Sequence, residues 1–194
     1  MARLREYDED AARAALVQTF LERGFADTSL SDLEAASGLN RRQLYNDFGD
    51  KKSLLLQAID DFSGIAGRRF LAKLEHSDQG VAAIRATLNA LVKAADSTEG
   101  RMGCLICNTS REPIAMESDV QLRLAEYFQR IERAYRAALA RAKDRQELSA
   151  KDSVGSLSRY FFGIHVSLCV MARAQVSTAV LKDVSKEALR RIRN

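Results

Sequence analysis

The stretch GLNRRQLYNDF, residues 38–48, has the pattern of a tight turn followed by a short helix. Asn40 can cap the start of this helix, and Gln43 stands three residues further on, at the capping-box position. Leu44 and Phe48 are four residues apart and therefore share one face, which we expect to be buried. Arg41, Arg42, Tyr45 and Asn46 carry side chains that donate hydrogen bonds. The pattern predicts a helix that is anchored on one side and presents donors on the other.

Two more helices are predicted before this stretch. The first begins at Asp8 and has acidic residues in its opening turn, where the helix dipole favours them. The second begins at a capping box made by Ser29 and Asp32 and stops at Gly38. A fourth helix is expected after Asp50. Three short helices, the last two joined by a tight turn, are typical of a helix-turn-helix, whose third helix enters a groove of DNA.

The composition indicates an all-α protein. One proline and ten glycines in 194 residues are too few for a turn-rich β-sandwich. Beyond the first four helices, apolar residues recur at helical spacing over residues 79–95 and from about residues 118, 149 and 177 onward. The apolar run over residues 160–172 is too short to span a bilayer and predicts a buried helix. Three cysteines and no secretion signal favour a reduced, cytoplasmic protein.

The charge is unevenly distributed along the chain. The whole sequence has a net charge of +4, but residues 1–60 hold eight Lys or Arg against eleven Asp or Glu, a net charge of −3. Residues 61–194 have a net charge of +7. Any DNA contact in the first third must therefore come from a local cluster, such as Arg41, Arg42, Lys51 and Lys52, and not from a basic domain.

The span from about residue 12 to residue 58 resembles the DNA-binding domain of the tetracycline-repressor (TetR) family of bacterial transcriptional regulators. The resemblance is carried above all by TSLSDLEAASGLNRRQLYNDFGDKKSLL, residues 28–55, with its threonine at the second helix, Leu-Tyr-x-x-Phe in the third, and lysine followed by leucines. It implies an all-α chain with a three-helix helix-turn-helix domain at residues 1–50. A larger helical ligand-binding and dimerisation domain is implied at residues 51–194, and its first helix connects the two.

The first turn of the third helix carries the side chains that we expect to read DNA. Arginine can donate two hydrogen bonds to guanine, and glutamine can pair with adenine. The resemblance implies that Tyr45, Lys51 and Thr28 contact phosphates. Arg42 stands where the family often has a small residue, so whether it reads a base or a phosphate is open. The expected DNA-binding residues are Thr28, Arg41, Arg42, Gln43, Tyr45, Asn46 and Lys51.

Cys104 and Cys107 form a CxxC pair that allows more than one interpretation. Packing, or the wall of a pocket, is the interpretation that we favour. A thiol-redox sensor is also possible, since residues three apart share a helix face. A zinc site is disfavoured, because Cys169, His76 and His165 do not stand at ligand spacing.

The C-terminal half supplies a candidate ligand pocket and a candidate dimer interface. Apolar residues between positions 157 and 171 alternate steps of three and four, as in a helix–helix seam, and the family layout pairs this helix with the last one between subunits. The candidate pocket residues are Met102, Cys104, Cys107, Tyr127, Phe162 and His165. The candidate interface residues are Leu157, Phe161, Ile164, Leu168, Met171 and Val184.

The sequence thus predicts a homodimeric, sequence-specific DNA-binding transcriptional regulator. We expect a repressor that a small-molecule effector releases from a pseudo-palindromic operator. No catalytic residue, cofactor or metal ion is expected, and an enzyme with a Cys/His pair is disfavoured because no nucleophile, base and orienting group stand in a recognisable context. A thiol-redox-sensing regulator that uses Cys104 and Cys107 remains open, and a helical interaction module without DNA binding is less favoured.

Overall fold

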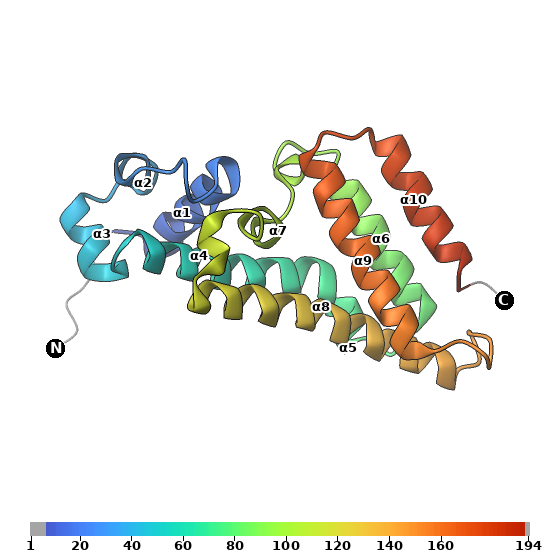
Figure 1. Cartoon of the computed structure of the whole chain (residues 1–194). Coiled ribbons are helices and arrows are strands. Elements are labelled where there is room, and N and C mark those ends of the chain that lie inside the picture. The colour runs from blue at the N-terminus through green and yellow to red at the C-terminus, as the bar shows by residue number, and fades with distance from the viewer. Residues whose placement is uncertain (1–6, 193–194) are drawn as a thin grey trace.

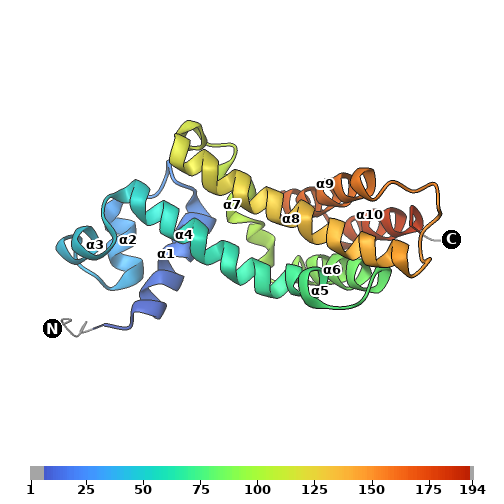
Figure 2. The ribbon, with the colours of Figure 1, turned by 90° about the horizontal axis from the view of Figure 1, so that it is seen from below.

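The computed structural model describes residues 7–192, and every regular element in that range is helical (Figure 1). The molecule is elongated. The first three helices lie at one end, and the helices labelled α6, α9 and α10 lie at the other. The helices α4 and α8 run lengthwise and contact each other between the two ends (Figure 2). The predicted all-α fold with an N-terminal helix-turn-helix is confirmed.

The N-terminal helices begin at the caps that the sequence predicts. The Asp8 side chain accepts from the N–H of Ala11, and Asp50 accepts from Ser53. Ser29 and Asp32 form a reciprocal capping box. The turn between the second and third helices passes through Gly38, whose φ of 70° is left-handed. The bounds are α1 (Glu9–Arg23), α2 (Leu30–Ser37), α3 (Arg41–Phe48) and α4 (Lys51–Ala66).

The third helix is held by a small apolar core. Leu44 and Phe48 are buried on its inner face, where Leu33 of α2 and Leu39 of the turn are buried as well. The sequence pattern predicts all four of these side chains in the core. Phe20 of α1 is fully buried in the same cluster. Their burial fixes which face of α3 points outward.

The rest of the chain forms a second group of helices around α8. Its elements are η1, a π-helical segment (Gly67–Leu71), α5 (Ala72–His76), α6 (Val81–Ala94), η2 (Gly100–Met102), α7 (Leu105–Thr109), η3 (Pro113–Met116), α8 (Ser118–Asp144), α9 (Val154–Arg173) and α10 (Thr178–Arg190). The helix expected from about Ser149 begins later, at Val154. A turn in which Asp152 N donates to Ser149 O precedes it, and Ser153 caps it.

An ion pair joins α8 to α5, the short helix that follows α4 and η1. The Arg130 guanidinium donates two hydrogen bonds to Glu75, at 2.7 and 2.9 Å. The Arg130 side chain passes directly over Gly67, where a Cβ would lie only 2.5 Å from Nη1. A side chain at position 67 would therefore push the guanidinium away from the place where it meets Glu75. The arginine lowers the pKa of the Glu75 carboxyl through these hydrogen bonds.

The helix α9 is long and apolar enough to cross a membrane by length and composition alone. Its position in the fold gives its composition another cause. Leu157, Phe161 and Leu168 are buried where α9 packs on α8 and α6, and Tyr160 and Val170 are exposed on another face. The helix is therefore apolar on a face that is covered within the chain and also on one that is not.

The helix α4 contacts both groups of helices. On the N-terminal side, Arg13 of α1 donates two hydrogen bonds to Asp61, at 2.9 and 2.6 Å. On the C-terminal side, Lys52 lies 2.9 Å from Asp119 of α8, and Arg123 pairs with Asp60. A division of the chain at residues 50 and 51 would assign α4 to the C-terminal domain, and it stays a prediction.

Candidate nucleic-acid interface

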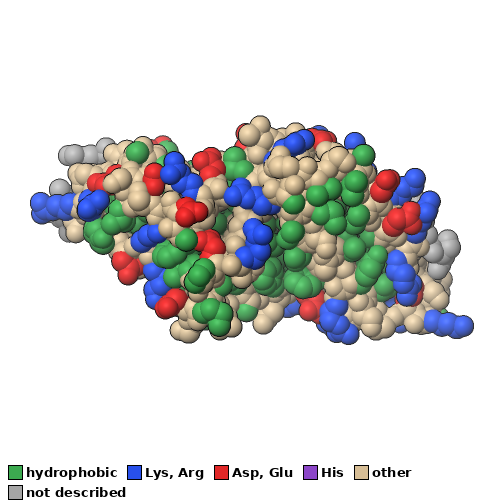
Figure 3. Space-filling model, turned by 45° about the horizontal axis from the view of Figure 1, so that its top comes forward, with side chains coloured by type: hydrophobic (Ala, Val, Ile, Leu, Met, Phe, Trp, Pro, Cys, Tyr) green, Lys and Arg blue, Asp and Glu red, His purple; other side chains and the backbone are tan. Residues whose placement is uncertain are grey.

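The outer face of α3 carries the donors expected from the sequence. Arg41, Arg42, Tyr45 and Asn46 are exposed, and the Tyr45 ring is 46% exposed despite its size. Lys and Arg side chains project outward at the end of the molecule formed by α2 and α3 (Figure 3). Leu44 and Phe48, four residues apart, hold one face of the helix in the core, so the exposed donors on the other face point outward.

The structure uses Gln43 as part of a helix cap. Its side-chain oxygen accepts from Asn40 N at 3.0 Å, and the Asn40 side chain accepts from Gln43 N at 3.0 Å. Pairing with adenine needs both the oxygen and the nitrogen of a glutamine amide. In this structure the oxygen is engaged in the cap, so the two arginines are the principal candidates to read bases.

The two arginines differ in their surroundings. Arg41 Nη2 lies 3.5 Å from a carboxylate oxygen of Glu34 in α2, a weak and largely exposed ion pair. Arg42 has no ion pair or hydrogen bond with any of residues 7–192. Arg42 is therefore the first-turn arginine whose donors are all available.

Lys51, at the start of α4, lies beside this face. Its ammonium nitrogen is 4.3 Å from the centre of the Phe25 ring, a cation–π contact that restricts the side chain. Lys52, the other lysine of the expected basic cluster, is engaged elsewhere. It bonds to Asp119, and this bond raises the pKa of its ammonium group. Of the two lysines, only Lys51 is available near α3.

Thr28, an expected phosphate contact, has its hydroxyl engaged within the chain in this structure. The side chain is 1% exposed, and its hydroxyl donates to Gly24 O at 2.5 Å, within the turn that follows α1. In this conformation Thr28 closes that turn and offers no hydroxyl to a phosphate. The sequence could not predict this, because the same hydroxyl also suits a phosphate contact before the second helix.

Contacts from the C-terminal half hold the same turn, and sequence reasoning missed them. The Glu112 carboxylate accepts from Phe25 N at 3.0 Å and from Ala26 N at 2.8 Å. Arg173 donates to Glu22 O at 2.9 Å. The partners are 86 to 151 residues apart, so no local pattern could have predicted these contacts.

The three cysteines form a cluster in the core, and all are free thiols. Cys104 and Cys107 are 5% and 6% exposed. Hydrogen bonds from Cys107 and Cys169 lower the pKa of the Cys104 thiol, and the same contacts with burial raise the pKa values of the other two. Among residues 7–192, no three His, Cys, Asp or Glu side chains are placed to hold a metal ion.

His165 is a core histidine. It lies 3.3 Å from the Tyr135 hydroxyl, and burial lowers its pKa to about 4, so that the ring is neutral at pH 7. Tyr127 is also buried, and Phe162 packs edge-on against Phe128. Tyr127 and His165 are thus part of the core, and Phe162 is packed against it.

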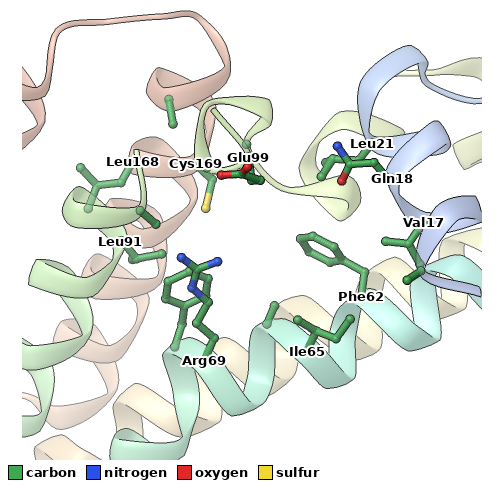
Figure 4. Close-up of a pocket in the computed structure, with 17 residues that line it drawn as sticks. Val17, Gln18, Leu21, Phe62, Ile65, Arg69, Leu91, Glu99, Leu168 and Cys169 are labelled. Atoms are coloured by element: carbon green, nitrogen blue, oxygen red, sulfur yellow. The ribbon is translucent and has the colours of Figure 1, made fainter. Parts of the chain in front are cut away.

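A cavity of about 290 Å³ lies elsewhere, where α1 and α4 face α6, η2 and α9 (Figure 4). None of the six residues expected to line a pocket belongs to its wall. The neighbours that do so include Cys169 of α9 and Gly103. The six residues stay a prediction for a pocket wall, and this cavity is a second candidate beside the same segment.

Three of the six residues of the expected dimer seam pack inside the chain, and the seam stays a prediction. Leu157, Phe161 and Leu168 are buried within the chain, because spacing of this kind serves α8–α9 packing equally well. Ile164, Met171 and Val184 are half-buried. The exposed large apolar side chains of these two helices are Tyr160, Val170 and Val180. Figure 3 shows hydrophobic side chains gathered on the surface over this end of the molecule.

Known proteins match the chain along nearly its whole length. A family model described as "Bacterial regulatory proteins, tetR family" matches residues 12–58, and one described as "Tetracyclin repressor-like, C-terminal domain" matches residues 80–188. The uncharacterized HTH-type transcriptional regulator YezE of Bacillus subtilis is 30% identical, over 94% of this chain and 95% of its own. The HTH-type transcriptional repressor ComR of Escherichia coli is 24% identical, over 97% and 90%.

A solved structure has the same fold. It contains a cysteine mutant of the TetR family transcriptional regulator CifR complexed with 26-base-pair double-strand operator DNA, and it matches with a TM-score of 0.87 at 25% identity. The match covers 97% of this chain and 98% of that one. The helical arrangement described above is thus shared with a regulator whose structure has been solved in complex with operator DNA.

Proposed function

This chain belongs to the TetR family of bacterial transcriptional regulators, and on that premise we propose that it is a repressor released from its operator by a small molecule. As a member of the family it is a DNA-binding regulator and not an enzyme. The name of the repressor ComR supports repression as the direction of control. The observation that carries the proposal is a capped, core-anchored helix whose outer face holds exposed donors.

Arg42 is the principal base-reading residue in this proposal. Its guanidinium is exposed and unengaged, and two parallel N–H groups suit guanine O6 and N7. Arg41 joins it when DNA phosphates compete with Glu34, whose ion pair at 3.5 Å is weak. Gln43 keeps α3 capped and contributes its amide N–H groups alone.

Tyr45, Asn46 and Lys51 fix the position of α3 on the duplex. The Tyr45 hydroxyl and the Lys51 ammonium are the groups that we assign to phosphates, which set register without reading sequence. Asn46 is exposed on the same face and is assigned a contact at the edge of the site. Thr28 is not assigned a contact, because its hydroxyl is used within the turn.

We further propose that the chain acts as a homodimer through α9 and α10. The exposed Tyr160, Val170 and Val180 form an apolar surface that water does not favour. A two-fold axis there would place two copies of α3 to read half-sites of a pseudo-palindromic operator. This surface lies on the same two helices as the seam expected from the sequence, on a face that is exposed in the single chain. The cytoplasm, where DNA and a reduced thiol pool are found, is the proposed location.

A thiol-sensing function is not favoured. Cys104 and Cys107 are both nearly inaccessible, so an oxidant in solution would have to wait for the core to open. The match to curated regulators extends over both halves of the chain and does not depend on these cysteines. Packing accounts for both residues.

Electrophoretic mobility shift with the intergenic DNA upstream of the gene tests the proposal. We expect wild type to retard this fragment at low salt and an unrelated fragment of equal length much less. The double variant R41A/R42A should lose the retarded band. R85A removes an exposed arginine from α6, far from α3, and should behave as wild type. No retardation by wild type at low salt would overturn the proposal.

A further inference from the structure

The cavity between α1 and α9 has walls from both halves of the molecule. Val17 and Leu21 of α1 form one side, and Leu168 of α9 forms the opposite side (Figure 4). Phe62 and Ile65 of α4 lie between them, and the Phe62 ring points into the space. Its volume of about 290 Å³ is at the lower end of the range for small-molecule sites. The site is therefore small, apolar and shared between the DNA-binding helices and the C-terminal helices.

Two charged residues line this cavity, and their charges are opposite. Arg69 and Glu99 are both exposed side chains at its edge, and Arg69 points into it from the side of η1. Within residues 7–192 neither forms an ion pair or a hydrogen bond through its side chain. The Arg69 guanidinium lies 5.2 Å from the centre of the Phe70 ring. Each charge is thus available to a bound molecule, and the lining as a whole is neutral.

We propose that this cavity is the effector site, and that its ligand is a neutral, mainly apolar small molecule with one polar group. The polar group accepts from Arg69 and donates to Glu99, as a hydroxyl, an amine or a carboxamide can. A charged ligand would satisfy one of the two residues and leave the other facing a like charge in a space partly closed to water. The inference rests on the proposed function, because an effector requires a regulator.

The position of the cavity gives a direct route to DNA. The helix α1 contributes its wall and also packs against α2 and α4, so any change in the spacing of α1 and α9 displaces the helix-turn-helix. A ligand alters DNA affinity only if it binds one spacing better than the other. Because the wall itself is part of the DNA-binding domain, no intermediate element is needed to transmit the difference.

Two related dyes probe the charge of the site. N-phenyl-1-naphthylamine is neutral, has two apolar ring systems and carries one N–H donor, and 1-anilinonaphthalene-8-sulfonate is the same framework with an anionic group. We expect saturable fluorescence enhancement with one molecule of the neutral dye per chain. The sulfonate dye should bind about fivefold more weakly than the neutral dye, which is the size of effect expected from one unfavourable, partly exposed charge contact. The E99Q variant should abolish this preference, and R69Q should increase it. A wild-type preference for the sulfonate, unchanged in E99Q, would overturn the assignment of ligand class.

A filling variant tests the location. Ala14 is an exposed residue of α1 on the edge of the cavity, so A14W should occupy the space without disturbing the core. We expect it to weaken binding of the neutral dye at least about tenfold, or 1.4 kcal/mol. A11W adds the same indole to an exposed position of α1 that does not line the cavity, and it should bind dye as wild type does. Equal binding by A14W and wild type would overturn the location.

Mobility shift with the upstream fragment separates this inference from the proposed function. If wild type fails to retard the fragment but A14W still excludes the dye, the proposed repressor function is overturned and the cavity remains a binding site. If wild type retards the fragment and the dye changes its affinity, A14W should keep DNA binding and lose the response to dye. Dye that fills the cavity without changing DNA affinity would overturn the coupling.

Discussion

Glu112 accepts the N–H groups of Phe25 and Ala26 with its two carboxylate oxygens, at 3.0 and 2.8 Å. A carboxylate from the segment before η3 thereby holds the turn that leads from α1 to the helix-turn-helix. The turn passes through Gly24, whose φ is 79°, and a Cβ there would lie 2.9 Å from the carboxylate. Glu112 is thus packed against backbone and links the C-terminal half to the end of α1.

The E112A variant should destabilise the chain and loosen this turn. Two backbone donors would lose a charged acceptor, which costs about 1–3 kcal/mol after water replaces part of it. We expect a lower midpoint of unfolding in urea. We also expect weaker operator binding, because the turn that positions α2 and α3 would no longer be held in place. E126A removes an exposed glutamate from α8 and is the control. Unchanged midpoint and affinity in E112A would show that water supports the turn equally well.

Replacement of Arg42 by alanine should weaken binding to the operator by about 1–3 kcal/mol. The guanidinium is exposed and has no competing contact to be released, so the loss appears in full. Binding to a panel of operator variants, each altered at one base pair, decides its role. Relaxed preference at one position indicates base reading. An equal loss on every variant would assign Arg42 to a phosphate instead.

Replacement of Lys51 by alanine should weaken binding to all DNA sequences by the same factor. A phosphate contact releases a counterion, so the slope of log K against log salt should fall by about one. The cation–π contact with Phe25 holds the ammonium in place before binding. K51R keeps the charge and should keep the slope. A slope identical in K51A and wild type would mean that Lys51 lies outside the interface.

The local features of the first fifty residues could be predicted because their causes are local. Asn40 and Gln43 are three residues apart, and Leu44 and Phe48 are four apart, so a cap and a buried face follow from spacing alone. Even the competition for Gln43 between capping and base reading is visible in the sequence. Spacing alone does not choose between the two uses, because both need the same side chain, and in this structure the side chain forms the cap.

The candidate effector cavity could not be predicted, since its wall combines distant segments. Val17, Phe62, Glu99 and Leu168 come from separate parts of the chain, and apolar residues in a sequence look the same whether they fill a core or line a space. The seam at Leu157 has the same ambiguity, because a helix face can pack within one chain or between two. The sequence therefore indicated which helices matter and not which of their faces are covered.

Stability should depend on pH through Glu75. Arg130 lowers its pKa, so the pair contributes stability that is present above the unfolded pKa and is lost as pH falls through the lower folded value. At pH 7 we expect the free energy of unfolding of E75Q to be lower than that of wild type by about 1–2 kcal/mol, a figure that already allows for the partial exposure of the pair. The difference, followed by urea unfolding, should shrink in acid. E132Q removes the exposed α8 pair with Arg136 and should show little of this dependence.

The exposed apolar face of α9 leads to a last prediction, on assembly. Val170 is 42% exposed at the surface that we assign to the dimer, so V170E should place a carboxylate in a desolvated contact with its symmetry mate. We expect wild type to sediment as a dimer at micromolar concentration and V170E as a monomer. L122E adds the same charge at an exposed leucine of α8 and should remain dimeric. A monomer holds one half-site at a time, so V170E should also bind the operator more weakly while retaining its helical content. If V170E sediments as a dimer, the two-fold axis lies elsewhere, and the spacing of the two α3 helices must be reconsidered with it.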